Sequence, residues 1–143
     1  MIKILVWTEG DPAPGQIAAG YFRFYGHAYL EVFHTDVAGA VADPSAVQVM
    51  AEDGIDITSL ESSTPDSLDP AEFQYVLVPE SIPNHHLSSG WKKQSRLIRL
   101  PGYHSPGQKG TLAEEQLQQL RDAREEIKKY VLKFIGKEIM SDI

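Results

Sequence analysis

The sequence contains no cysteine. That absence excludes disulfide bonds, metal sites built on thiolates, and any catalytic mechanism with a cysteine nucleophile. Long apolar runs are missing too, because none approaches the roughly 18 residues that a membrane-spanning helix needs. The short apolar run Ile4–Trp7 lacks the flanking residues of a signal peptide, so we expect a cytoplasmic protein with no membrane contact.

Positive charge is scarce as well. The chain has 13 Lys and Arg residues against 20 Asp and Glu residues, which gives a formal net charge of −7. The electric field of this net negative charge repels phosphate backbones, so we expect neither nucleic acid nor an anionic membrane as a partner. The basic residues cluster only weakly, at positions 91–96 and at Lys128-Lys129, and we interpret the lysine pair as part of a solvated helix face.

The remaining composition is that of an ordinary globular protein. Of its 143 residues, 42% are hydrophobic, and we expect a single domain over residues 1–143. Apolar runs alternate with helical periodicity. Strands are predicted at Ile2–Trp7, Tyr29–Val37, Phe73–Pro79 and Arg96–Leu100, and a loop at Ser62–Pro70. This alternation predicts an α/β fold with three layers: a four-stranded parallel sheet with helices on both faces.

Three helices are predicted as well, two of them between strands and the third after the last strand. The first ends at Tyr25, capped by Gly26, and its buried face is predicted to hold Ile17, Tyr21, Phe24 and Tyr25. The second begins at Asp43-Pro44-Ser45, with Val47, Met50 and Ala51 facing inward and Gly54 closing it. The third follows a capping box formed by Thr111 and Glu114, and its apolar positions recur from Ala113 to Phe134.

Ligands of open parallel sheets bind outside the carboxyl ends of the strands, where the first strand leads into the first helix. In this chain that place is the loop Thr8–Gly15. The candidate ligand-binding residues are therefore Thr8, Glu9, Gly10, Asp11 and Gly15.

Four segments resemble a known family, the low-molecular-weight protein tyrosine phosphatases and their thioredoxin-coupled arsenate-reductase relatives. The segment Ala46–Ile57 is the most specific match and resembles the second helix of that family. Supporting matches are Ile4–Trp7 with Gln16–Tyr21, Phe73–Val76 and Arg121–Ile127. The resemblance covers nearly the whole chain and implies the same fold.

The chain departs from this family at the residues that carry its chemistry. The family uses Cys-x5-Arg in the first loop, because the reaction needs a thiolate nucleophile and a guanidinium that clamps an oxyanion. Aligned on Gln16, those positions hold Thr8 and Pro14, and the general acid of an Asp-Pro pair is replaced by Ser105 before Pro106. The resemblance therefore implies a degenerate pseudoenzyme without phosphatase or arsenate-reductase activity.

The first loop is also poorly suited to hold a phosphate ion. A helix N-terminus favours anions through its N–H groups and its dipole. Pro12 and Pro14 each remove a backbone donor, however, and Glu9 and Asp11 place carboxylates where phosphate oxygens would lie. We expect little or no oxyanion binding and interpret the loop as a rigid turn.

A metal site is the alternative use of the same edge. If the family fold holds, the loops with His85, His86 and His104 open toward Glu9 and Asp11. Imidazole and carboxylate ligands suit zinc, manganese or iron. No HxH or HExxH spacing supports such a site, and paired histidines in polar loops are commonly just exposed.

Two functions therefore remain open. The first is a non-catalytic binding or regulatory protein with no cofactor, which contacts a protein partner through the rim of the former active site. The second is a metal-dependent enzyme or metal-binding protein that uses the loop carboxylates and histidines. Trp91 beside Lys92 and Lys93 either forms an exposed patch for a partner or folds onto the edge of the domain.

Overall fold

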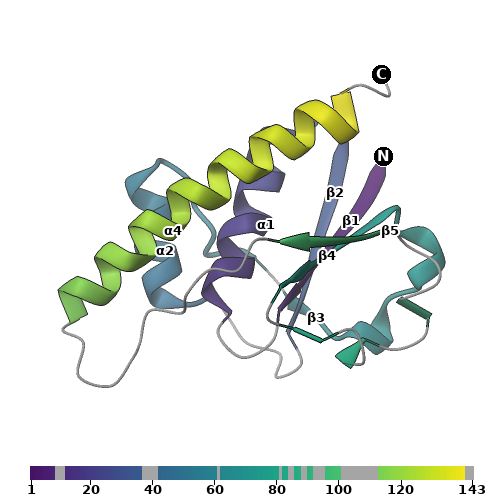
Figure 1. Ribbon diagram of the computed structural model, residues 1–143, viewed down its shortest axis with the longest axis horizontal. Coiled ribbons are helices and arrows are strands. Elements are labelled where there is room, and N and C mark those ends of the chain that lie inside the picture. Colours follow the sequence, from purple (N-terminus) through teal and green to yellow (C-terminus); the bar gives the residue numbers. More distant parts are fainter. Residues whose placement is uncertain are drawn as a thin grey trace.

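A parallel sheet organises the chain (Figure 1). The computed structural model describes residues 1–8, 12–36, 42–60, 62–80, 82–83, 86–87, 90–91, 96–100 and 113–140. Its five strands are β1 (Ile2–Thr8), β2 (Leu30–Asp36), β3 (Ser62–Ser63), β4 (Tyr75–Pro79) and β5 (Arg96–Leu100). Their order is β3-β2-β1-β4-β5, and every neighbouring pair is parallel. β1 thus lies in the centre of the sheet.

The predicted α/β architecture is confirmed, with one strand more than expected. The sequence predicts a loop at Ser62–Pro70, but Ser62 and Ser63 pair with His34 and Thr35 of β2. A strand of two serines at the edge of a sheet has no apolar alternation, so periodicity gives no sign of it. Its shortness and polarity also suit an edge strand, because long apolar edges invite aggregation.

Three helices cover one face of the sheet: α1 (Ala13–Gly26), α2 (Pro44–Glu52) and α4 (Ala113–Phe134), which continues into a π-helical turn, η4 (Ile135–Ile139). In Figure 1, α4 runs along the outside of α1 and α2. The core on this face includes Ile4 and Val6 of β1, Ile17 and Phe22 of α1, and Val131 of α4. Each of these five residues is fully buried.

The buried face of α1 differs from the prediction at Phe24, which is 53% exposed. Phe22 is buried instead and packs edge-on against Phe134 of α4. Two residues along a helix correspond to a rotation of about 200°, so the two rings point to opposite sides. Gly26 is the last residue of α1 rather than a left-handed cap, because Gly54 is the only glycine with a positive φ among the described residues.

The start of α2 is confirmed, whereas its predicted inward face is partly wrong. Asp43 caps the helix through its carboxylate, which accepts hydrogen bonds from the backbone of Ser45 and Ala46. The buried residues are Ala46, Val49 and Met50. Val47 is only partly buried and Ala51 is exposed. The α2 helix contacts both α1 and α4, so its inward stripe is set by two neighbours that sequence periodicity does not reveal.

The opposite face of the sheet has its own core, which we call the turn-side core. It consists of Leu5, Trp7, Phe73, Val76, Val78, Ile82, Leu87 and Trp91. The cover on this side comes from Ile82, Leu87 and Trp91 and from Leu68 and Phe73, which follow two short 3-10 helices, η1 (Pro65–Ser67) and η2 (Pro70–Glu72). Trp91 is 1% exposed and its ring contacts Phe73. It is therefore part of a core and forms no exposed patch.

None of the described helices combines the length and the apolar character that crossing a membrane requires.

Candidate functional site

The carboxyl end of β1 is the predicted site, and the structure describes it on both sides of the loop. β1 lies between β2 and β4, which are reached by connections of opposite direction, so the chain has a topological switch point there. Thr8 ends β1 and Pro12 precedes α1. Glu9, Gly10 and Asp11, which the sequence places in the site, lie outside the described residues.

Thr8, which the alignment on Gln16 assigns to the nucleophile position of the resembled family, is held in place by packing and by a hydrogen bond. Its side chain is buried, and its hydroxyl donates to the backbone carbonyl of Thr35 in β2. The β-branched side chain also packs against Gly15 of α1, where an added Cβ would overlap the Thr8 methyl group. A hydroxyl that donates to a carbonyl directs its proton away from any base, which leaves it a poor nucleophile.

The N-terminal end of α1 offers few donors. No side chain caps this helix, and Pro12 and Pro14 have no backbone N–H. The N–H of Gln16 is already bonded to the carbonyl of Pro12 at 3.0 Å. Pro14, which the alignment on Gln16 predicts at the arginine position of the resembled family, supplies neither a guanidinium nor a backbone donor for an oxyanion.

The same edge of the sheet is joined to α2 by Gln16. This side chain is fully buried, and its Oε1 accepts a hydrogen bond from the backbone N of Asp43 at 2.7 Å. Asp43 in turn caps α2, so one buried amide ties the start of α1 to the start of α2. In the sequence Gln16 serves only to align the loop, and no local pattern indicates this structural role.

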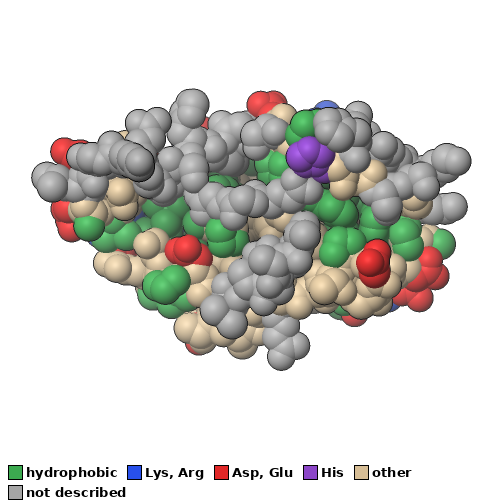
Figure 2. Space-filling view, turned by 90° about the horizontal axis from the view of Figure 1, so that it is seen from below, with side chains coloured by type: hydrophobic (Ala, Val, Ile, Leu, Met, Phe, Trp, Pro, Cys, Tyr) green, Lys and Arg blue, Asp and Glu red, His purple; other side chains and the backbone are tan. Residues whose placement is uncertain are grey.

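A cavity of about 380 Å³ opens at this edge, where α1, α2 and α4 begin; we call it the rim cavity. Its lining includes Ala13, Asp43, Ser45, Glu114 and Leu117. Two of its lining residues are acidic, and no described lysine or arginine lines it. Figure 2 looks onto this side of the molecule, and among the coloured side chains Lys and Arg are visible only at the margin. The described lining of the rim cavity therefore supplies no cationic side chain for an anion.

The proposed metal ligands are mostly outside the described part of the chain. Of Glu9, Asp11, His85, His86 and His104, only His86 is described, and it is exposed. Among the described residues, no group of three or more His, Asp or Glu side chains could hold a metal ion. Ser105, which replaces the family's general acid, also lies outside the described residues.

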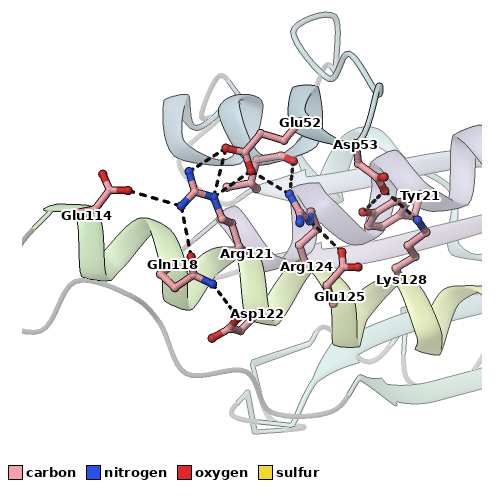
Figure 3. A network of polar contacts seen from close by, with 11 residues as sticks. Tyr21, Glu52, Asp53, Glu114, Gln118, Arg121, Asp122, Arg124, Glu125 and Lys128 are labelled. Atoms are coloured by element: carbon pink, nitrogen blue, oxygen red, sulfur yellow. Dashed lines mark hydrogen bonds and ion pairs between the residues drawn. The ribbon is translucent and has the colours of Figure 1, made fainter.

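A second polar cluster lies away from this edge, between α1, α2 and α4 (Figure 3). We call it the polar clamp; it comprises Tyr21, Glu52, Asp53, Arg121, Arg124 and Lys128. Arg121 and Arg124 both contact the Glu52 carboxylate, at 2.9 and 3.0 Å. The hydrogen bond from Arg121 is the main reason why the pKa of Glu52 is lowered. The charged groups of the polar clamp are paired with one another. The clamp therefore joins α1, the end of α2 and α4, and its charged groups are engaged in structural contacts.

Asp53 connects the other two members of the clamp. It accepts hydrogen bonds from the Tyr21 hydroxyl at 2.8 Å and from Lys128 Nζ at 3.1 Å. Burial by itself would raise the pKa of Asp53, but these two hydrogen bonds and the positive charges of Lys128 and Arg124 together outweigh burial, and the pKa lies below the ordinary value. The sequence suggests a solvated Lys128; in the structure this lysine has a defined partner.

Acid should weaken the contribution of Asp53 to stability. Because its pKa is lower in the folded chain, this contribution is complete above the unfolded pKa, about 4. It is lost as the pH falls through the lower folded value. We expect Asp53→Asn to destabilise the protein at pH 7 and to match wild type more closely at pH 3, as measured by urea unfolding at each pH. Asp66→Asn, in an exposed 3-10 turn, is the matched control and should differ little from wild type at either pH.

The close contact between Gly15 and Thr8 predicts how substitutions at these two positions change the stability of the chain. Gly15→Ala should destabilise the chain by roughly 1–2 kcal/mol, because a buried methyl group has no room there. Thr8→Ser keeps the hydroxyl and removes the obstructing methyl group. The double variant should therefore be more stable than the sum of the two single changes predicts. Purely additive losses in thermal unfolding would show that the two side chains do not compete for this space.

The fold and the site together define a class: an open parallel α/β domain with a topological switch point at the end of its central strand and no cysteine in the loop that follows. No family model and no curated protein matches the sequence. Solved structures do match. An arsenate reductase in the oxidized state is 21% identical, with a TM-score of 0.79, over 96% of this chain and 98% of that chain. An arsenate reductase in the reduced state is 20% identical, with a TM-score of 0.78 and the same coverage.

A low-molecular-weight protein tyrosine phosphatase from T. tengcongensis is 19% identical, with a TM-score of 0.74, over 96% of this chain and 99% of that chain. This chain therefore has the fold shared by arsenate reductases and low-molecular-weight tyrosine phosphatases, as the resemblance implied. It carries that fold without a single cysteine.

Proposed function

We propose that this chain is a non-catalytic binding protein that keeps the phosphatase-type scaffold and contacts a protein partner through the edge around the rim cavity. The observation that carries the proposal is the state of Thr8, which is buried, bonded to the Thr35 carbonyl, and packed against Gly15. The solved structures with this fold are named as arsenate reductases and tyrosine phosphatases. The chemistry of such enzymes in this chain would need a nucleophile that Thr8 does not supply.

Three further observations support the loss of chemistry. Pro14 stands where a guanidinium would stabilise an oxyanion, and Ser105 stands where a carboxylic acid would protonate a leaving group. The described lining of the rim cavity has acidic members and no basic ones. Each change by itself lowers the rate of phosphoryl or arsenate chemistry, and together they remove nucleophile, clamp and acid.

The scaffold, by contrast, is maintained. The core on the helical face, the turn-side core and the polar clamp are all well packed, and Gln16 still positions the start of α2. A domain that retains its packing and loses its chemistry can still present a shaped surface to a partner. The rim cavity is the described hollow at the edge where ligands of this topology bind, so it is the natural centre of such a surface.

Charge reversal at the rim tests the binding role. Glu114 lines the rim cavity and its side chain is 83% exposed, whereas Glu126 lies further along α4 and its side chain is 63% exposed. We expect the wild-type chain and Glu126→Lys to retain the same protein from an extract of the source cells, and Glu114→Lys to lose it. Equal retention by all three proteins would place the partner elsewhere, and no retained protein at all would contradict the binding role.

A further inference from the structure

A second hollow, of about 320 Å³, is lined by residues of α1 and of the chain that leaves α2, and by no described residue of the loop after β1. Its floor is formed by the buried side chains of Ile55, Ile57 and Leu60. Arg23 and Phe24 of α1 stand at its rim. We call it the Arg23 pocket. All of its lining residues belong to the described part of the chain.

Two glycines build this pocket. Gly20 lets the segment after α2 approach α1 closely, since an added Cβ would lie 2.7 Å from Ile57 Cγ2 and 3.0 Å from the Met50 methyl carbon. Gly54 has a φ of +76°, a conformation that favours glycine, and turns the chain back after α2. The shape of the hollow is therefore set by backbone geometry.

The two charged side chains that line the Arg23 pocket, Arg23 and Asp56, differ in how many of their hydrogen bonds are already made. Among the described residues, the Arg23 guanidinium makes one hydrogen bond, to the carbonyl of Val32 at 3.5 Å. A guanidinium has five N–H donors, so most of its capacity remains for a ligand. Asp56 also lines the pocket, but its carboxylate accepts hydrogen bonds from the Thr58 backbone at 2.9 Å and hydroxyl at 2.6 Å, which lower its pKa. These bonds hold the Asp56 carboxylate in its own turn but leave its negative charge in place, so an anion in this pocket must pair with Arg23.

Phe24 adds an aromatic face to this arrangement. Its side chain is 53% exposed beside the pocket, although the helix around it is well packed. An apolar floor, an aromatic wall and one cation are the usual elements of a small-molecule site, in which the apolar lining gives affinity and the polar group fixes orientation. Planar carboxylates match a guanidinium through two parallel hydrogen bonds.

We propose that the Arg23 pocket binds a small monocarboxylic acid with an aromatic or branched apolar body. The carboxylate pairs with the Arg23 guanidinium, and the apolar body lies on Ile55, Ile57 and Leu60 beside the Phe24 ring. This site is separate from the rim cavity and does not depend on the proposed function. Its failure would leave that proposal standing.

Benzoate and benzamide are suitable probes because they have nearly the same shape and differ in charge. We expect benzoate, titrated at constant ionic strength, to shift the amide resonances of Gly20, Gly54 and Ile57 saturably. Benzamide should bind at least about tenfold more weakly, the effect of losing roughly 1.4 kcal/mol from the charged pair. Absence of saturable shifts with benzoate, or equal affinity for benzamide, would overturn the proposal.

Two substitutions sharpen the test. Arg23→Gln removes the guanidinium at an exposed position and should weaken benzoate binding at least about tenfold. Arg23→Lys keeps the charge without the planar donor pair and should fall between Arg23→Gln and wild type. Lys133→Gln removes an exposed cation of α4 outside the pocket and should leave the affinity unchanged. Equal losses in Arg23→Gln and Lys133→Gln would show non-specific attraction and would also overturn the proposal.

Discussion

Replacing Trp91 with alanine should destabilise the protein by roughly 3–5 kcal/mol, the largest loss that we expect from a single substitution in this chain. The ring is 1% exposed and contacts Phe73, with their centroids 5.2 Å apart. It closes the turn-side core over Leu5 and Trp7 of the central strand. Its removal leaves a cavity that Phe73 and Leu87 are too short to fill. Urea unfolding monitored by circular dichroism measures the loss.

An exposed ring provides the comparison. Phe24→Ala removes an aromatic side chain that is 53% exposed, and its effect on the free energy of unfolding should be within about 0.5 kcal/mol. Trp91→Phe keeps much of the ring and should lie between the two. If Trp91→Ala were as stable as Phe24→Ala, Trp91 would not belong to a core, and the description of the second face of the sheet would be wrong.

Arg124→Met should destabilise the chain by about 2–3 kcal/mol, because it removes the side-chain donor of the Val49 carbonyl and one of the two guanidinium groups that contact Glu52. The side chain is 15% exposed and its Nη1 donates to the Val49 carbonyl at 2.8 Å and to Glu52 at 3.0 Å. It therefore completes the C-terminal end of α2 from the neighbouring helix. Methionine retains the apolar stem, so the change isolates the guanidinium.

Arg121 is the matched control for this substitution. It also contacts Glu52, but its bonds go only to side chains near the surface. We expect Arg121→Met to be less destabilising than Arg124→Met in the same thermal unfolding experiment, because exposed ion pairs add little to stability. Equal losses would indicate that the shared carboxylate of Glu52, and not the Val49 carbonyl, accounts for the effect of Arg124.

Much of the fold can be predicted from sequence because its strands are apolar runs with few alternatives. The predicted bounds of β1 and β5 lie within one residue of the observed ones. β3 cannot be predicted, because two serines have no alternation of apolar and polar residues. The start of α2 can be predicted, because Asp43-Pro44 is a local signal for the beginning of a helix. Which side of α1 faces inward depends on α4, which follows nearly ninety residues later, and this is why the predicted burial of Phe24 is wrong.

The position of the candidate site stays a prediction. The parallel alternation predicts it at the end of β1, and the alignment on Gln16 assigns Thr8 and Pro14 to the nucleophile and arginine positions of the resembled family. The hydrogen bond from Thr8 to Thr35 and the packing against Gly15 depend on the register between strands, which no local pattern contains. The Arg23 pocket leaves no sequence signal, since its walls come from two segments separated by some thirty residues.

The most direct test of the loss of chemistry is the hydrolysis of p-nitrophenyl phosphate by the wild-type chain and by Thr8→Ala at equal concentration. We expect both proteins to release nitrophenol at the rate of buffer alone, because a hydroxyl bonded to the Thr35 carbonyl is a poor nucleophile and a proline has no guanidinium to clamp an oxyanion. A wild-type rate above that background, abolished in Thr8→Ala, would show that the Thr8 hydroxyl attacks phosphorus and would contradict a non-catalytic role.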